Sequence, residues 1–324
     1  MNDELLKNHN IRGLLADYLG MTIALISLII IFGLSANNFF TQATFRTLAN
    51  QVADVTIAAV GMTFVLIIAG IDLSVGSVMA LAGAVLGITV VNWDAPLALG
   101  VVLCLLTGLA CGTANGLIVI RWGLPSFIVT LGMLEVARGA SYLVTDSRTI
   151  YINSIDMVTE PIVAGLSAPF FLAILVVIAG QLVLSRTMFG RYLIAIGTNE
   201  EAVRLSGIDP RPYKLAVFAL SGFLAAVASV IQTARMSSAN PNTATGFELQ
   251  VIAAVVIGGT SLMGGRGSVV RSFFGVLIIA VLGAGLAQVG AQEYTKRLIT
   301  GCVIVAAVIL DQYRHRPGRV SSRS

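Results

Sequence analysis

The sequence predicts an all-α, polytopic membrane protein of about ten transmembrane helices, some of them broken or re-entrant. Of its 324 residues, 56% are hydrophobic and only 11% are charged, whereas soluble domains are about 25% charged. Apolar windows of the ~20 residues that a helix needs to cross a ~30 Å hydrocarbon core recur along the chain. Lys and Arg are unevenly distributed among the segments that join these windows. Residues 1–324 are therefore expected to form one transmembrane domain.

The apolar windows define ten candidate spans in chain order. They are residues 18–36, 50–70, 73–92, 96–120, 124–145, 164–185, 213–235, 247–262, 270–289 and 297–311. The first follows a charged start and has no small-residue cleavage site, so it predicts a membrane helix and not a cleaved signal peptide. The eighth is short, which predicts a tilted, broken or re-entrant segment.

The basic residues predict the orientation of the spans. With the N-terminus inside, 14 of the 20 Lys and Arg residues fall on the inner side and six on the outer side, as expected for cytoplasmic loops. A cytoplasmic N-terminal segment (1–17), a cytoplasmic C-terminal tail (312–324) and a location in the bacterial inner membrane follow. The net charge of +4 reflects this topology, and no basic soluble face indicates a nucleic-acid partner.

Few residues suggest cofactor or enzyme chemistry. Cys104, Cys111 and Cys302 lie in apolar surroundings without a CxxC pair, so neither a disulfide nor a metal site is expected. No lysine lies in a GxxxxGK[ST] motif, so ATP hydrolysis would require another subunit. The only histidines, His9 and His315, lie at the chain ends, which argues against a membrane-embedded enzyme. No cofactor is expected.

The stretch IAGIDLSVGSV, residues 68–78, places a carboxylate between two apolar segments. A charge at that depth costs at least ~2.5–3.5 kcal/mol on insertion scales, so Asp72 indicates a specialised position. Gly70, Ser74 and Gly76 predict that one helix ends near Gly70 and another begins near Leu73. Asp72 or Ser74 would then cap the second helix by accepting a backbone N–H. Breaks at membrane depth must be buried in protein or line a water-filled cavity, and in transporters they mark the pathway.

Four further polar residues lie in the predicted spans. Asp54 is near the outer end of the second span, within reach of the headgroups. Asn115 follows small residues and is expected to bond to a neighbouring helix more readily than to a ligand. Glu135 and Arg138 are three residues apart and are expected to form an ion pair. A secondary transporter that uses Asp72 or Asp54 as an ion-linked carboxylate is the alternative function.

A second interruption, IGGTSLMGGRGSV at residues 257–269, aligns with the first after two residues are inserted. Each joins two apolar segments, which favours a pair of matching bends. Many glycines without a P-loop lysine indicate close packing or a bent backbone, not a phosphate cradle. Both bends face the same side in the predicted topology, as in a parallel repeat, unless the eighth segment is re-entrant. The residues expected in the second bend are Gly258, Gly259, Ser261, Gly264 and Gly265.

The longest predicted inner loop, residues 186–212, contains a short helix outside the bilayer. A Thr-Asn pair followed by Glu200 and Glu201 is typical of a helix start. The helix would continue from Ala202, close at Gly207 in a left-handed turn and be stopped by Pro210. Alone it would be marginal in water, so a packing partner is expected. It is either a solvated connector or a docking helix for a cytoplasmic partner.

Several stretches carry a family resemblance. EAVRLSG, residues 201–207, resembles the coupling loop of ABC importer permeases, with Val203 in place of the second alanine of Glu-Ala-Ala. GMTFVLIIAGIDLSVGSVMALAG (61–83), GLPSFIVTLGML (123–134), GRYLIAIGTNEEAVRLSGI (190–208) and AAVVIGGTSLMGGRGSVVRSFFGVLI (253–278) closely resemble permeases of ribose-type sugar ABC importers. The resemblance extends from about Tyr18 to Asp311. In one departure, Ala69 replaces the first of the two glycines that usually precede Ile-Asp-Leu-Ser.

The resemblance implies a monosaccharide import permease that forms the sugar pathway with a second permease chain, identical or closely related. It further implies a cytoplasmic ATPase with two nucleotide-binding domains, a periplasmic sugar-binding protein, and no covalent chemistry in the permease. The residues expected to couple to the ATPase are Glu200, Glu201, Ala202 and Gly207. The residues expected in the translocation pathway are Gly70, Asp72, Ser74, Gly76 and Asn115.

Two polar segments, residues 144–161 and 238–250, are expected on the outer side. Solvated connectors are their simplest interpretation, and the resemblance adds a surface that a sugar-binding protein contacts. Their carboxylates would then pair with basic groups of that partner and mainly tune the rate of encounter. These carboxylates are Asp146, Asp156, Glu160 and Glu248.

Overall fold

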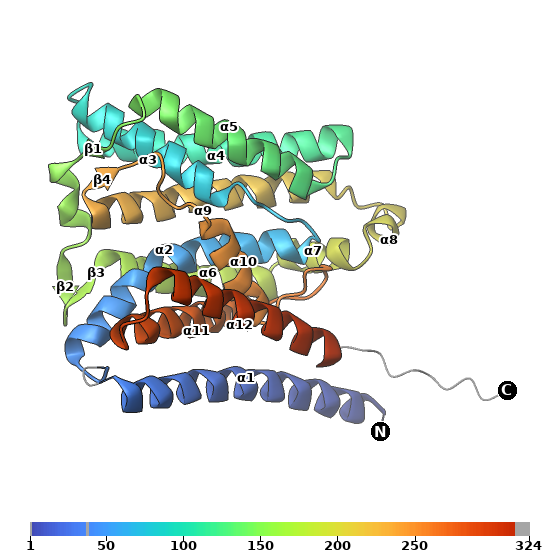
Figure 1. The fold of residues 1–324 in the computed structure, drawn as a ribbon. Helices are drawn as coiled ribbons and strands as arrows, with labels where there is room; N and C mark the ends of the chain where they lie inside the picture. The colour runs from blue at the N-terminus through green and yellow to red at the C-terminus, as the bar shows by residue number, and fades with distance from the viewer. Residues whose placement is uncertain (1, 37–38, 315–324) are drawn as a thin grey trace.

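The computed structural model describes residues 2–36 and 39–314, and the predicted C-terminal tail lies mostly outside them. The described chain is almost entirely helical, as predicted (Figure 1). Its helices are α1 (Asn2–Ser35), α2 (Gln42–Ile67), α3 (Val75–Val91), α4 (Leu97–Trp122), α5 (Ser126–Thr145), α6 (Ala168–Arg186), α7 (Met188–Thr198), α8 (Glu200–Leu205), α9 (Arg211–Met236), α10 (Phe247–Ile257), α11 (Val269–Gln288) and α12 (Glu293–Arg314).

Each of the ten predicted spans corresponds to one helix. Seven helices are long and apolar enough to cross a membrane: α1, α2, α4, α5, α6, α9 and α11. The helices α3 and α10, of 17 and 11 residues, are apolar but shorter. The tenth predicted span falls in α12, which carries charged residues near both ends. The remaining two helices, α7 and α8, lie between α6 and α9.

Short strands gather at one end of the helices, and α8 lies at the other (Figure 1). Strand β1 (Ile150–Tyr151) pairs antiparallel with β4 (Ser238–Ala239), which joins the two segments that follow α5 and α9. A 3₁₀ helix (Asn153–Val158) follows β1. The strands β2 (Pro161–Val163) and β3 (Leu166–Ser167) form a hairpin before α6.

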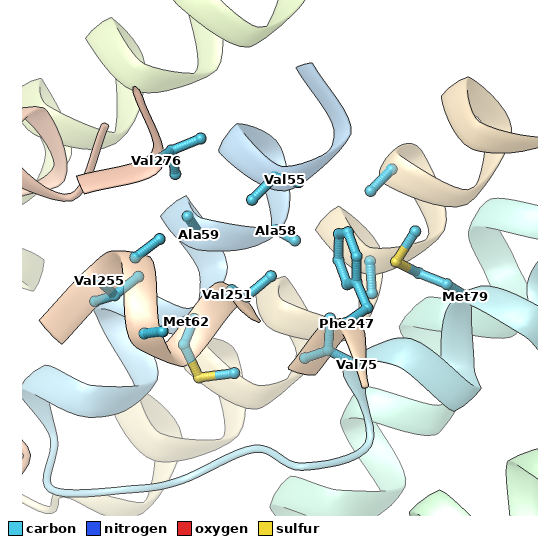
Figure 2. Packing of buried hydrophobic residues seen from close by; sticks show 14 of the residues in the cluster. Val55, Ala58, Ala59, Met62, Val75, Met79, Phe247, Val251, Val255 and Val276 are labelled. Atoms are coloured by element: carbon cyan, nitrogen blue, oxygen red, sulfur yellow. The ribbon is translucent and has the colours of Figure 1, made fainter. Parts of the chain in front are cut away.

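The helix α2 lies at the centre of the core. It is buried from Val52 to its last residue and packs against α6, α9, α10 and α11. Figure 2 shows one part of this core, where Val251 and Val255 of α10 lie near Met62 of α2. By contrast, only 6% of the apolar part of α1 is buried within the single chain, where α1 packs against α11. Apolar burial therefore holds the short helix α10 against α2.

The helices α4 and α9 pack closely against each other. Gly108 and Gly112 of α4 lie against Gly222 of α9, and a methyl group at any of the three would overlap backbone atoms of the other helix. Small residues permit this approach between membrane helices. The contact brings the adjoining turn of α9 next to the start of α3, where the first bend lies.

Candidate translocation core and coupling site

The first bend separates α2 from α3. The first helix ends at Ile67 and the second begins at Val75, so the non-helical stretch is wider than predicted by three residues before Gly70 and by two after Leu73. Ala69 adopts a left-handed conformation with φ 57°, and the Gly70 N–H donates to the carbonyl of Val65 at 2.9 Å. A left-handed residue at this position ends a helix and favours glycine. Ala69 is the position where the resembling family usually has glycine.

The Asp72 carboxylate is buried and accepts three hydrogen bonds. Its Oδ1 accepts from the Ser74 N–H at 3.0 Å and from the Ser74 hydroxyl at 2.6 Å, and its Oδ2 accepts from the hydroxyl of Ser221 on α9 at 2.9 Å. Ser74 is the N-cap residue of α3, but its side chain makes no capping bond. Of the two predicted caps, Asp72 therefore supplies the acceptor. We name Asp72, Ser74, Asn115 and Ser221 the polar knot.

Asn115 completes the polar knot from α4. Its amide Nδ2 donates to the Ser74 hydroxyl oxygen at 3.0 Å, and the side chain is fully buried. The prediction that Asn115 bonds to a neighbouring segment is confirmed. Since Asn115 and Ser221 lie on α4 and α9, the polar knot ties three segments of one chain together at membrane depth.

Hydroxyl groups of α5 satisfy the other side of the first bend. The Ile71 N–H donates to Ser126 Oγ at 2.9 Å, and the Leu73 N–H donates to Thr130 Oγ1 at 3.1 Å. Non-helical backbone at membrane depth requires such partners because lipid offers none. The sequence interpretation missed Ser126, Thr130 and Ser221. The signal that could have identified them is a hydroxyl side chain within an otherwise apolar helix.

The second bend, residues 258–268, separates α10 from α11 and is built from backbone. Gly259, Gly264 and Gly265 have φ angles of 79°, 82° and 73°. The Ser261 N–H donates to the carbonyl of Arg266 at 3.0 Å. The two predicted bends are thus both present, and they touch: the Gly265 N–H donates at 2.8 Å to the carbonyl of Ile67, the last residue of α2. This bond satisfies one of the carbonyls that a helix end leaves without a partner.

The C-terminal end of α7 presses against the point where the bends meet. A methyl group at Gly197 would overlap the Ile67 carbonyl and lie 2.5 Å from the Gly265 nitrogen. We call Gly197, Ile67 and Gly265 the junction. The helix α7 was not predicted, although its buried Leu193 and Ile196 have helical spacing.

The short helix α8 forms as predicted. The Asn199 side chain accepts from the Ala202 N–H at 3.0 Å, and Gly207 closes the helix with φ 81°. The helix packs against α7, and Lys214 of α9 binds Glu200 with an N–O distance of 2.5 Å. Val203, at the second alanine position of the Glu-Ala-Ala pattern, is buried in the same cluster as Val217 of α9.

The outer face of α8 is open. Glu201 and Ala202 are exposed, and Leu205 has 81% of its surface exposed. A hollow of about 330 Å³ lies beside the helix, lined by residues that include Arg204, Gly207 and Arg211. An exposed leucine beside a hollow with two arginines is suited to contact another protein.

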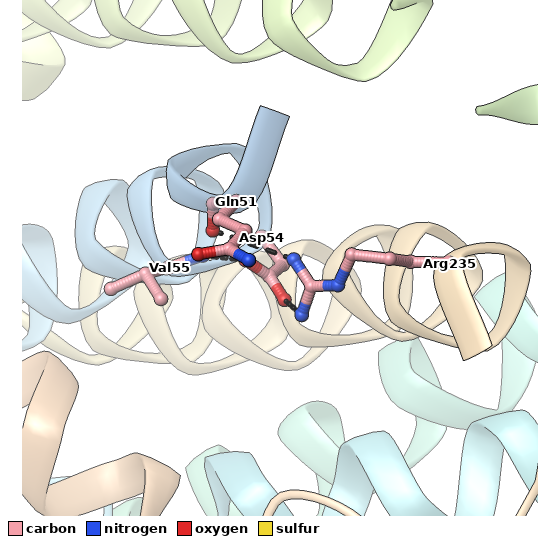
Figure 3. Close-up of polar contacts among 4 residues, drawn as sticks. All are labelled: Gln51, Asp54, Val55 and Arg235. Carbon is pink, nitrogen blue, oxygen red and sulfur yellow. Dashed lines mark hydrogen bonds and ion pairs between the residues drawn. The ribbon is translucent and has the colours of Figure 1, made fainter. Parts of the chain in front are cut away.

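Asp54 does not reach toward the headgroups, so that prediction is wrong. Its carboxylate is buried and accepts from Arg235 Nη2 of α9 at 2.8 Å, while the Val55 N–H donates to its other oxygen (Figure 3). Arg235 Nη1 also donates to the carbonyl of Gln51 at 3.4 Å. The pair forms because the last turn of α9 lies beside the middle of α2, and removal of one partner of such a pair costs about 3–5 kcal/mol.

The predicted Glu135–Arg138 ion pair is also wrong. Arg138 Nη1 donates to the carbonyls of Pro241 at 2.5 Å and Thr243 at 2.8 Å, while Glu135 is exposed. Carbonyls of a non-helical segment lack backbone partners, so they attract the guanidinium. Glu248 is not on a solvated connector either: it lies in the first turn of α10, half-buried, with its carboxylate against Gly76 of α3.

Apolar helices, two bends that meet in the core and a capped helix outside the spans define a multi-pass membrane transport protein. The chain matches the family model described as "Branched-chain amino acid transport system / permease component" over residues 44–308, and it belongs to this family. Within it, the chain is a ribose-type ABC permease: it is 40% identical over 297 residues to the ribose import permease protein RbsC of Haemophilus influenzae, covering 90% of this chain and 92% of the relative.

Two further comparisons extend this result. The fructose import permease protein FrcC of Rhizobium meliloti is 34% identical over 302 residues, which cover 90% of this chain and 84% of the relative. A solved ABC transporter of metal-chelate type, in an inward-facing conformation, matches with a TM-score of 0.52 and 13% identity over 91% of this chain and 98% of the solved chain. At that identity the match supports the fold alone.

Proposed function

We propose that this chain is the permease subunit of an ATP-driven, binding-protein-dependent monosaccharide importer in the bacterial inner membrane. It forms the sugar pathway with a second permease chain, identical or closely related, and receives sugar from a periplasmic binding protein. The single observation that carries the proposal is the junction, where α7 connects the exposed helix α8 to both bends. The similarity to a ribose import permease and a fructose import permease supports a monosaccharide.

The cytoplasmic ATPase would bind α8 at Glu200, Glu201, Ala202 and Gly207, with both chain termini on the same side. The start of α1 and the end of α12 lie at the α8 end of the helices (Figure 1), which agrees with that orientation. Only Asn199 separates α8 from α7, so displacement of α8 would reach Gly197 directly. The ATPase must bind the two permease conformations unequally to shift their equilibrium.

The residues proposed for the pathway have different roles. They are Gly70, Asp72, Ser74, Gly76 and Asn115. The buried members Asp72, Ser74 and Asn115 bond within one chain, so they would set the shape of the first bend without contacting sugar. Gly70 would close α2, and Gly76 would allow the segment before α10 to approach α3. The glycines Gly258, Gly259, Gly264 and Gly265, with Ser261, would hold the second bend against them.

Sugar uptake with the coupling helix altered tests the proposal. Glu201→Lys reverses an exposed charge on α8, and Gly207→Pro is incompatible with φ 81°. Both variants should abolish uptake while the protein still inserts. Asp94→Lys, a charge reversal at an exposed residue between α3 and α4, is the control and should retain uptake. Normal uptake in both α8 variants would contradict the docking role.

The energy source is tested separately. Uptake should stop when the partner ATPase is catalytically disabled, and an uncoupler should have no direct effect. Uptake that persists with the disabled ATPase and collapses with the uncoupler would instead show an ion-coupled carrier that uses Asp72 or Asp54.

A further inference from the structure

We propose that residues 240–246, together with Glu135 and Tyr142 of α5 and Glu248 of α10, form a polar wall that contacts a polyhydroxylated, uncharged solute in the pathway. This inference rests on the proposed function and specifies where the sugar binds. It places solute contact away from the polar knot, on a segment between β4 and α10.

Residues 240–246 descend to membrane depth. The 20 residues of α11 rise ~30 Å, the thickness of the hydrocarbon core, whereas the 11 residues of α10 rise only ~16 Å. The end of α10 lies beside the first turn of α11, because Gly258 contacts Ser272. Phe247, at the start of α10, is therefore near the middle of the membrane, and residues 240–246 cross the other half without helical structure.

Contacts along the segment follow the same descent. At the strand end, the Asn240 amide donates to Thr149 Oγ1 at 2.9 Å, beside the β1–β4 pair. Deeper, Arg138 of α5 binds the carbonyls of Pro241 and Thr243. Deeper still, the Ala244 carbonyl lies against Gly76, in the first turn of α3. The backbone is thus held by α5 and α3, and the side chains of Asn242 and Thr245 stay available.

Those available side chains are polar and exposed. Asn242 and Thr245 are exposed, and so is Glu135, the tenth residue of the 20-residue helix α5. Polar groups and non-helical backbone at this depth do not face lipid, because lipid cannot hydrogen-bond to them. By contrast, exposed side chains near the middle of other helices are apolar, such as Leu106 of α4 and Leu175 of α6. The polar wall therefore faces a water-filled space.

The chemistry of the polar wall fits sugar hydroxyl groups. Carboxylates of Glu135 and Glu248 accept hydrogen bonds, while the Asn242 amide and the Thr245 hydroxyl both donate and accept. Tyr142 adds an aromatic face, and its hydroxyl donates to Asn242 Oδ1 at 2.6 Å. The carboxylates of Glu135 and Glu248 outnumber the nearby guanidinium of Arg138. The resulting negative charge disfavours anionic solutes. A site built to bond hydroxyls discriminates strongly against solutes that lack them.

Cysteine accessibility in intact cells tests the polar wall. Thr245→Cys and Leu175→Cys are each placed in a chain with Cys302→Ser, which leaves buried Cys104 and half-buried Cys111. A membrane-impermeant, charged methanethiosulfonate should modify position 245 on the order of tenfold faster than position 175, because thiolate forms only in water. D-ribose or D-fructose at saturating concentration should slow modification of position 245. Equal, slow modification at both positions would overturn the proposal.

Two matched variants that each lack one hydroxyl group test solute contact through their rates of sugar uptake. Thr245→Val and Thr113→Val each remove a hydroxyl that bonds a carbonyl of its own segment, at 2.8 and 2.7 Å. Thr245→Val should lower uptake about fivefold at unchanged abundance, and Thr113→Val should not. Equal uptake in both variants would overturn the polar wall while leaving the proposed importer intact. Uptake that ignores the ATPase would instead overturn the proposed function.

Discussion

The first and second bends interrupt helices in the same core but are stabilised by different groups. In the first bend, side chains satisfy the backbone: Asp72 binds the Ser74 N–H, and Ser126 and Thr130 bind two more N–H groups. In the second bend, glycines with positive φ bring backbone groups to each other and to Ile67. Lipid cannot supply either kind of partner.

The comparison shows that a charged residue at membrane depth does not by itself mark solute contact. Asp72 is the most conspicuous acid of the sequence, yet all its bonds stabilise backbone and hydroxyl groups of its own chain. The second bend contains no carboxylate, and its N–H groups are satisfied largely by backbone carbonyls. Substitutions that remove side-chain acceptors should therefore affect the first bend, and added methyl groups should affect the second.

Asp72→Ala should have the largest effect on stability. It leaves the Ser74 N–H and the hydroxyls of Ser74 and Ser221 without an acceptor, at a cost of about 3 kcal/mol or more. The midpoint of thermal unfolding in detergent and the abundance in membranes should both fall. Asp72→Asn is the control. Its amide oxygen can still accept from Ser74, and its amide N–H can donate to the Ser221 hydroxyl, which then accepts instead of donating. Loss of transport in a stable Asp72→Asn protein would show that the charge itself is required.

Gly197→Ala tests the junction, where the two bends share one contact. The added methyl overlaps the Ile67 carbonyl, so it should destabilise the protein by about 2 kcal/mol and strongly reduce uptake. Gly283→Ala on α11 has open space for its methyl and should be neutral or slightly stabilising. Wild-type uptake by Gly197→Ala would remove the junction from the coupling route.

Gly265→Ala tests the backbone chemistry of the second bend. A left-handed φ of 73° should cost about 1–2 kcal/mol for alanine. Gly290→Ala has φ 81° and no neighbour in contact, so it measures the conformational cost alone. The unfolding temperature of Gly265→Ala should be lower than that of Gly290→Ala, because the methyl group at position 265 also overlaps Thr198. The reverse order would contradict the packing of the second bend.

Ala69→Gly should have the smallest effect, and of opposite sign. Ala69 has φ 57°, and glycine there should stabilise the protein by about 0.5–1 kcal/mol. The increase in unfolding midpoint should accompany unchanged uptake if Ala69 only ends α2. A lower midpoint would mean that the methyl contact with Gly264 outweighs the relieved strain.

Much of this arrangement was predictable, because local signals specify it. Long apolar runs predict helices, Asn199 and Gly207 delimit α8, and glycine clusters predict both bends. What was not predictable depends on pairing between distant segments. Arg138 could have reached Glu135 on its own helix, and only the placement of residues 241–243 offers it carbonyls instead. Likewise, Arg235 is 181 positions away from Asp54.

The sequence by itself determined the membrane class, the ten apolar helices, the two interruptions and the family, because composition, hydrophobic length and turn residues act locally. Only the tertiary structure decided what each polar group does. It buried Asp72 among hydroxyls, joined the bends at Ile67 and left Glu135 exposed beside residues 240–246. The physical reason is that a buried polar group without a partner costs free energy, and which partner is near depends on how the helices pack.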